Sequence, residues 1–246
     1  AALKPYHTLA KSSDTYNLDP QDYIPEWTWE IADEFGIAIV LHLVKNKALA
    51  DPANSTYIQE KCTKYPNAKL ILAHCARGFC ADTVIDGISS LRGLENVWFD
   101  TAAVCESEAI RAVLWEFGPT KLLWGTDFPI SQLHSRCVTI GNGFHWVEPE
   151  LDKHCQAASN LVESLRALYR ACADFGLNIQ DVEKIFYGNA TALFGLEKSD
   201  TNKTQELYEH AKSVIPGGVQ LLSKRPEMMA PGLWPPYFSE ARGCEV

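Results

Sequence analysis

Three polar residues stand at the ends of three apolar runs of the sequence. His42 lies within AIVLHLV, His74 ends KLILAH, and Asp127 follows KLLWGT. Imidazole nitrogens and carboxylates are ligands of zinc-type divalent ions, and the same groups can take a proton from water. If each run is a strand of one parallel sheet, the three side chains meet at the carboxyl edge of that sheet. The pattern predicts a metal-hydrolase site on a β/α barrel.

Each candidate residue also has an ordinary structural explanation. A lone buried histidine is more commonly a hydrogen-bonded core residue, and Asp127 before a proline could cap a helix. Three such residues on nearby strands favour the functional interpretation. Arg77 could pair with a substrate carboxylate or be a cation at a helix start. Thr101 could line the same pocket through its hydroxyl, and Asp100 beside it could orient a neighbour.

Amphipathic helical stretches alternate with short apolar runs between residues 25 and 127. We expect helices over 25–36, 54–65 (capped by Asn54 or Ser55), 80–92 and 106–117, and strands over 37–44, 68–74, 96–102 and 121–127. The N-terminal LKPY could end one more strand. Strands that are apolar throughout and alternate with helices predict a parallel sheet with both faces covered.

The predicted fold class is therefore α/β, with four or five β/α units of a partial TIM-like (β/α)8 barrel plus a short C-terminal extension. An open doubly wound sheet is the competing architecture, although the sequence has no glycine-rich phosphate loop. Residues 128–159 show little periodicity and are interpreted as a lid or specificity loop, with a surface insertion as the alternative. Further helices are expected over 160–175 and 180–187.

Composition narrows the classes of partner. The net charge of −9 argues against nucleic acid or an anionic membrane as a main partner. The sequence contains no run of 18 apolar residues, the length that a membrane-spanning helix needs. A small-molecule substrate is the expected partner, and homo-oligomerisation stays open. The eight cysteines are scattered without a CxxC pair, which indicates reduced thiols and a cytoplasmic location.

Five segments together resemble the C-terminal half of the amidohydrolase superfamily, in particular its amidohydrolase-related (amidohydrolase 2) branch. They are LHL around His42, LAHCARGF around His74, VWFDTA, LLWGTDFP around Asp127, and NATALFGL. The resemblance covers about residues 2–196. It implies a distorted (β/α)8 barrel with a catalytic zinc or similar metal, and a family that includes hydrolases, lactonases and non-oxidative decarboxylases.

The resemblance also implies roles for single residues. His42 would be a metal ligand, His74 a ligand or the catalytic base, and Asp127 would bind metal and handle the proton. Lys4 lies where some relatives carry a metal-bridging carboxylated lysine, and we group it with Arg77 and Thr101 as a candidate substrate-binding residue. The family's first strand supplies an H-x-H or E-x-H pair that this sequence lacks. We therefore expect a chain that starts near the fourth strand, with an incomplete metal shell, and that is inactive and aggregation-prone alone.

The tail carries a second resemblance. Residues 199–246 read as a polar linker followed by TQELYEHAKSVIPGGVQLLSKRP and FSEARGCEV, which resemble the start of class III pyridoxal-phosphate aminotransferases, especially glutamate-1-semialdehyde aminomutase. An unrelated extension is the competing interpretation. The boundaries expected are 1–198 for the barrel and 199–246 for the linker and aminotransferase-like segment. Pyridoxal phosphate is expected only if an aminotransferase domain follows.

The leading functional hypothesis is a metal-dependent hydrolase that activates water at a divalent ion, most simply zinc, and acts on a small carboxylated substrate. A non-oxidative decarboxylase would use the same ligands, so these residues do not separate the two reactions. Two further hypotheses are an aminotransferase-linked fusion module and a degenerate barrel with only a binding role.

Overall fold

The computed structural model of the chain describes residues 1–150, 152–196 and 201–215. Two compact units divide the chain, Ala1–Gly195 and Leu196–Val246. Within the described part of the second unit, residues Thr201–Val214 form helix α9. Most of the aminotransferase-like segment lies outside the described residues, and its assignment stays a prediction.

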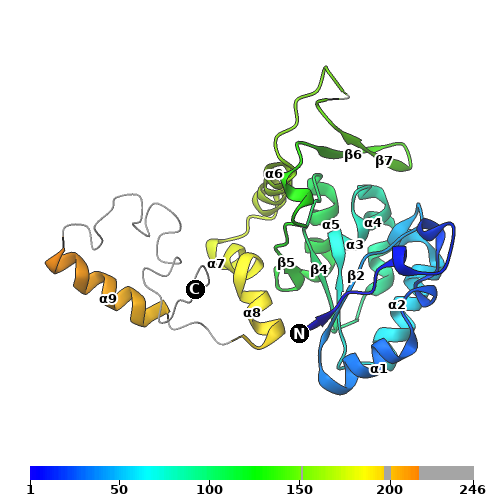
Figure 1. Cartoon of the computed structure of the whole chain (residues 1–246), viewed down its shortest axis with the longest axis horizontal. Coiled ribbons are helices and arrows are strands. Elements are labelled where there is room, and N and C mark those ends of the chain that lie inside the picture. The colour runs from blue at the N-terminus through cyan, green and yellow to red at the C-terminus, as the bar shows by residue number, and fades with distance from the viewer. Residues whose placement is uncertain (151, 197–200, 216–246) are drawn as a thin grey trace. The chain divides into compact units, whose positions relative to one another are not determined.

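The first unit is built on a parallel sheet flanked by helices (Figure 1). The strands are β1 (Ala2–Leu3), β2 (Ala38–Leu41), β3 (Lys69–Leu72), β4 (Val97–Asp100) and β5 (Leu122–Leu123), with a separate hairpin of β6 (Arg136–Ile140) and β7 (Gly143–Val147); the helical segments are α1 (Glu26–Phe35), α2 (Pro52–Lys64), α3 (Ala73–Arg77), α4 (Ala81–Gly87), α5 (Ser107–Phe117), α6 (Asn160–Asp174), α7 (Ile179–Glu183) and α8 (Asn189–Phe194).

The order of the strands identifies the architecture. They pair as β1-β2-β3-β4-β5, each parallel to the next, so neighbours in the sequence are neighbours in the sheet. A doubly wound sheet has a point at which the strand order reverses, and this sheet has none among the described residues. The sequential order is that of part of a (β/α)8 barrel. The predicted α/β class is confirmed.

Alternation of side chains along the strands produces two covered faces. Ile39 and Leu41 point to one face and join the main core, which packs against α1, α2, α4 and α5 (Figure 1). Ala38 and Ile71 point to the other face, where they contact Leu193 of α8. Both faces of the strands are therefore apolar because both are packed, as the unbroken apolar runs predicted.

Several predicted boundaries were wrong. Helix α2 begins at Pro52, with Asp51 as its N-cap, because proline suits the first helical position and the Asp51 side chain accepts the Ala53 amide at 3.0 Å. Asn54, the expected cap, is buried and donates to two backbone carbonyls at 2.7 and 3.1 Å. The expected helix over 80–92 ends as α4 at Gly87 and continues as a 3-10 turn, Ile88–Leu91.

The segment over 128–159 is also more regular than the sequence indicated. It contains the β6–β7 hairpin, whose side chains are mostly half-buried, so no clear apolar alternation marks it. Glu163 of α6 holds the start of the hairpin. Its buried carboxylate accepts Arg136 at 3.1 Å, Arg166 at 2.8 Å and the Ala158 amide at 3.0 Å. The three donors offset the cost of burying the charge and join the hairpin to α6.

Gly87, at the end of α4, permits a close backbone approach. A Cβ atom there would lie 2.6 Å from the carbonyl carbon of Leu49 and 2.7 Å from the amide nitrogen of Ala50. We expect Gly87→Ala to lower the free energy of unfolding by about 1–3 kcal/mol, because backbone atoms must move to admit the methyl group. Urea unfolding followed by circular dichroism measures this change. Gly143→Ala is the matched control, since a Cβ at Gly143 meets nothing within 4 Å; equal loss in both variants would contradict the packing argument.

Cysteines in the described ranges carry free thiols. There are seven of them, and six are buried. Cys244 lies outside those ranges. Across residues 1–150, 152–196 and 201–215, no helix combines the length and the apolar character that crossing a bilayer requires.

Candidate active site

The strands deliver the predicted residues to one edge of the sheet. His42 follows the last residue of β2, His74 lies in α3 just beyond β3, and Asp127 lies beyond β5. All of these are carboxyl ends of parallel strands, where barrel enzymes build their sites. The strands are shorter than the predicted 37–44 and 121–127, so His42 lies just beyond its strand rather than within it, and Asp127 lies well past the end of β5. The contacts of each side chain show which of them meet.

His42 is a buried imidazole with an unused nitrogen. Its Nδ1 atom is buried without a hydrogen-bond partner. Its ring centroid lies 5.0 Å from that of His74, with the two rings nearly perpendicular. Burial, together with the electrostatic effect of the nearby His74 and Arg77, lowers the pKa of His42 to about 3. The ring is therefore neutral at physiological pH and can present a lone pair to an electrophile.

His74 is held in one orientation and one tautomer. Its Nδ1 lies 2.8 Å from the carbonyl oxygen of Ala102. A carbonyl oxygen only accepts hydrogen bonds, so Nδ1 must carry the proton. In the neutral ring, Nε2 is then the atom with the lone pair. The backbone of His74 is anchored as well, because its amide donates to Oδ1 of Asp100 at 2.8 Å.

The turn that carries His74 is left-handed. In α3, residues 74–77 have φ angles of 58°, 49°, 61° and 64°, the mirror image of a normal helical turn. Non-glycine residues pay roughly 1–2 kcal/mol each in this conformation, so surrounding contacts must hold the turn. The amide of Gly78 closes it by donating to the His74 carbonyl at 2.6 Å. The turn brings both His74 and Arg77, three residues apart, near His42, because both residues lower the pKa of His42.

Arg77 is a buried cation without an anionic partner among the described residues. One guanidinium nitrogen, Nη1, donates to the carbonyl of Lys45, while Nε is buried and has no partner. The guanidinium lies 5.4 Å from the ring centroid of Phe144. Burial lowers the pKa of Arg77 from its ordinary value. An anion placed against Nε would satisfy both the charge and the free donor.

Asp127 acts electrostatically on Tyr6, a neighbour of His42. It is half-buried, in a left-handed conformation with φ of 56°, and its negative charge helps to raise the pKa of Tyr6. Tyr6 in turn lies 5.7 Å from His42, measured between ring centroids. The role of Asp127 as a metal ligand stays a prediction.

The donor atoms fit a metal ion in part. The unpartnered Nδ1 of His42 and the lone pair on Nε2 of His74 are nitrogen ligands of the kind that zinc accepts, on adjacent rings. However, no three His, Cys, Asp or Glu side chains converge to hold an ion among the residues that the structure describes. The histidine pair fits as two donors, and the described residues do not by themselves complete a coordination shell.

Thr101 and Lys4 have different surroundings from the histidines. The Thr101 hydroxyl accepts the Gly125 amide at 3.4 Å, and the residue is fully buried, so this hydroxyl joins the ends of β4 and β5. Lys4 is exposed, and its charge lowers the pKa values of both His42 and Asp100. Substrate contact by either residue stays a prediction.

Sequence reasoning missed His7. This residue is buried, stacks on His42 with a centroid distance of 5.6 Å, and has Nδ1 3.0 Å from the carbonyl of Thr15. Burial lowers the pKa of His7, and the same carbonyl contact opposes that effect. The available signal was its place shortly after the N-terminal strand, which parallels the placement of His42 and His74 after theirs.

Aromatic side chains extend the site toward the hairpin. Phe79 lies 5.0 Å from the ring of His74, and Phe144 and Trp146 of β7 lie 5.4 and 5.3 Å from Phe79. In the sequence GFHWV, the aromatic residues Phe144 and Trp146 alternate with other residues, and residues i and i+2 of a strand lie on the same side. This alternation was the sequence signal for an aromatic face of the hairpin. The segment interpreted as a specificity loop thus reaches the neighbourhood of the histidines.

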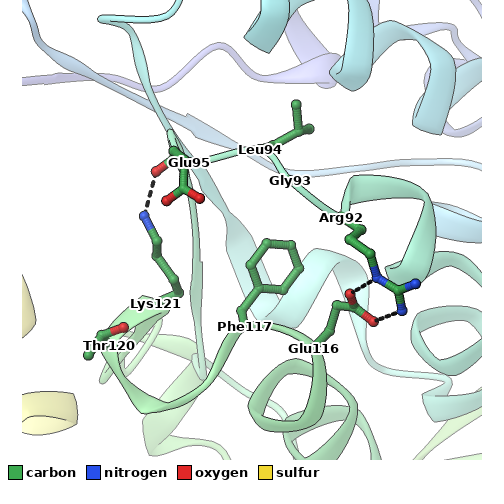
Figure 2. A pocket seen from close by; sticks show the side chains of 8 residues that line it. All are labelled: Arg92, Gly93, Leu94, Glu95, Glu116, Phe117, Thr120 and Lys121. Atoms are coloured by element: carbon green, nitrogen blue, oxygen red, sulfur yellow. Dashed lines mark hydrogen bonds and ion pairs between the residues drawn. The ribbon is translucent and has the colours of Figure 1, made fainter.

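A pocket of about 250 Å³ lies elsewhere in the fold (Figure 2). Its lining includes Glu95, which precedes β4, and Lys121, which precedes β5. These are amino ends of strands, opposite to the ends that carry the histidines. Arg92 and Glu116 in its lining form a bidentate ion pair, in which Nε and Nη2 of Arg92 donate to the two carboxylate oxygens at 2.6 and 2.9 Å. The pocket is separate from the candidate active site.

Comparison with known proteins gives a family match. The family model described as amidohydrolase matches residues 11–196. Two structures of an amidohydrolase from Burkholderia multivorans, with bound HEPES and with bound zinc, are 17% and 16% identical, with TM-scores of 0.49 and 0.48; the alignments cover 78% of this chain and 64% and 63% of those chains. The 5-carboxyvanillate decarboxylase from Sphingomonas paucimobilis is 14% identical, covers 69% of this chain and 52% of its own, and has a TM-score of 0.39. No curated protein matches the chain. The chain spans less than two thirds of the length of these structures.

Proposed function

Because the amidohydrolase model matches residues 11–196 of its 246 residues, the chain belongs to the amidohydrolase family, and we propose that the whole protein is a metal-dependent hydrolase. Its substrate is a small carboxylated molecule with an amide or lactone bond. One observation carries the proposal: two buried imidazoles 5.0 Å apart lie close to a buried guanidinium that has no carboxylate partner among the described residues.

His42 and His74 are the residues that would hold a divalent ion, and their nitrogen donors support zinc. When bound, such an ion lowers the pKa of a coordinated water and polarises the carbonyl under attack. Asp127 is proposed as a further ligand and proton acceptor. Further donors would be needed to complete the shell, since no three His, Cys, Asp or Glu side chains converge among the described residues.

The chain's own residues supply binding and proton chemistry. Arg77 directs Nε, which is otherwise unpartnered, to the substrate carboxylate. Nε2 of His74 carries the only lone pair of the ring, so it serves either as the ligand of the ion or as the acceptor of a proton, and not as both at once. His42 stays neutral near pH 7 because of its lowered pKa. Thr101 and Lys4 are proposed to contribute at the edge of the same substrate site.

The proposed cellular location follows from the state of the cysteines, because free thiols support a cytoplasmic location. Hydrolysis of a small molecule by a zinc enzyme requires no nucleic acid or membrane partner. Self-association into a homo-oligomer is compatible with the proposal. A complete aminotransferase frame after Val246 would make the protein a two-enzyme fusion with pyridoxal phosphate as a second cofactor.

Product analysis tests the proposed reaction. The protein expressed from its complete reading frame is loaded with zinc and incubated with a panel of carboxylated lactones, amides and aromatic acids. Hydrolysed products that disappear after chelation support the hydrolase. Release of carbon dioxide would instead assign the decarboxylase reaction, and stoichiometric metal without any turnover would point to a binding role.

Arg77→Met tests the carboxylate site. Methionine keeps apolar volume but removes the guanidinium, whose charged hydrogen bond is worth about 1.5–3 kcal/mol. We expect KM to rise about 10- to 100-fold with little change in kcat, because the carboxylate contact stabilises the bound substrate and the transition state equally. Steady-state kinetics with the best substrate of the panel measure both constants. Arg92→Met, at the opposite end of the sheet, is the control, and an unchanged KM for Arg77→Met would remove Arg77 from the substrate site.

A further inference from the structure

We infer that Asp100 is a positioning residue that sets the orientation and the tautomer of His74. The inference rests on the proposed function only in assigning a chemical role to Nε2 of His74. The hydrogen bonds that Asp100 makes do not depend on which reaction the protein performs.

Asp100 holds both backbone segments that define the His74 ring. Its Oδ1 atom accepts the amide of His74 at 2.8 Å and the amide of Ala102 at 3.0 Å. The carbonyl of that same Ala102 accepts Nδ1 of His74 at 2.8 Å. The three hydrogen bonds form a closed circuit that joins the backbone and the ring of His74 to one short segment after β4.

The circuit begins where the strand ladder ends. The last registered pair of β3 and β4 is Leu72 with Phe99. Beyond it the chain turns left-handed at His74, so its amide can no longer take part in a regular ladder. The Asp100 carboxylate takes the place of the missing strand carbonyl, which satisfies a buried amide that would otherwise cost free energy.

The consequence for chemistry concerns the other ring nitrogen. Asp100 holds the amide of Ala102, the residue whose carbonyl accepts Nδ1 of His74, and so helps to position that carbonyl. The carbonyl keeps the proton on Nδ1 and leaves the lone pair on Nε2. A rotated carbonyl would release the ring to exchange tautomers and orientation. Asp100 therefore acts through His74 and does not need to touch the substrate.

Nitrogen NMR tests the inference without any substrate. The full chain is labelled with ¹⁵N-histidine, and the signals of His74 are assigned by their absence in His74→Gln. In the wild-type protein we expect the Nδ1-protonated pattern for His74 at pH 7.5, with widely separated signals for the two nitrogens. The opposite tautomer in the wild-type protein would overturn the inference before any variant is made.

Variants of Asp100 separate positioning from general stability. Asp100→Ala and Asp100→Ser remove the oxygen that reaches both amides, and we expect the two His74 nitrogen signals to converge as tautomers mix. Asp100→Asn keeps Oδ1 and should retain the wild-type pattern. Asp33→Ala is the control, because Asp33 also accepts a backbone amide, that of Asn67 at 2.7 Å, but does so before the amino end of β3, whereas His74 follows its carboxyl end.

The outcomes distinguish the inference from the proposed function. An unchanged His74 pattern in folded Asp100→Ala or Asp100→Ser would overturn it, and so would a loss of the pattern in Asp33→Ala. If Asp100→Ala fails to fold, the serine and asparagine variants still give the comparison. A protein that shows the expected tautomer but no turnover would contradict the hydrolase and leave the role of Asp100 intact.

Discussion

Replacing His74 with glutamine is expected to lower kcat/KM by about 10²- to 10⁴-fold, the range that removal of a general base produces. His74 offers a neutral Nε2 lone pair because Ala102 holds the proton on Nδ1. Glutamine can mimic the size of the ring but cannot accept a proton at neutral pH. The measurement is kcat/KM of the protein from its complete reading frame, with the substrate that the product analysis selects.

The matched control is His145→Gln, since His145 lies on β7 and is exposed. Metal content, measured in the same preparations, separates the two roles that the sequence left open for His74. Zinc retained with activity lost assigns His74 as the base, whereas zinc lost with activity assigns it as a ligand. Wild-type activity in His74→Gln would exclude it from the reaction altogether.

Acidification is expected to destabilise the protein through His42. The folded protein lowers the pKa of His42 from its ordinary 6.5 to about 3, whereas the unfolded chain titrates at the ordinary value. Between those values the unfolded state binds the extra proton, so stability is lost as pH falls from 6.5 toward 3 and is unaffected by this group above 6.5. The slope approaches about 1.4 kcal/mol per pH unit only below pH 6.5, because the unfolded histidine is half protonated at that pH, so the loss between pH 6.5 and 4.5 is about 2 kcal/mol.

Urea unfolding at pH 7.5, 6.5, 5.5 and 4.5, in the presence of a chelator, measures this loss. The free energy of unfolding of His42→Gln should fall less steeply with pH than that of the wild-type protein, by about one proton. The neighbouring groups that act on His42, namely His7, His74, Arg77 and Lys4, remain in both proteins. Parallel pH profiles for the two proteins would show that His42 is not held neutral by the fold.

The order of the elements could be predicted from the sequence, whereas β2 and β5 end earlier than predicted, at Leu41 and Leu123. Apolar runs of four to eight residues alternating with amphipathic stretches identify buried parallel strands, because periodicity and length are local properties of the chain. A single polar residue at the end of such a run is then placed at the carboxyl edge of the sheet. His42 and His74 were found in this way. The boundaries failed where a stronger local signal was overlooked, as with Asp51-Pro52 at the start of α2.

Only the tertiary structure decided how the site is assembled. The hydrogen bond between Asp100 and the His74 amide joins two elements, and so does the stacking of His7 on His42. Asp100 and His74 are 26 positions apart, so no local pattern links them. Such contacts depend on strand register and on the path of each loop, which are set by packing of the whole unit. The sequence by itself thus determined which residues reach the edge of the sheet, and packing decided which of them meet.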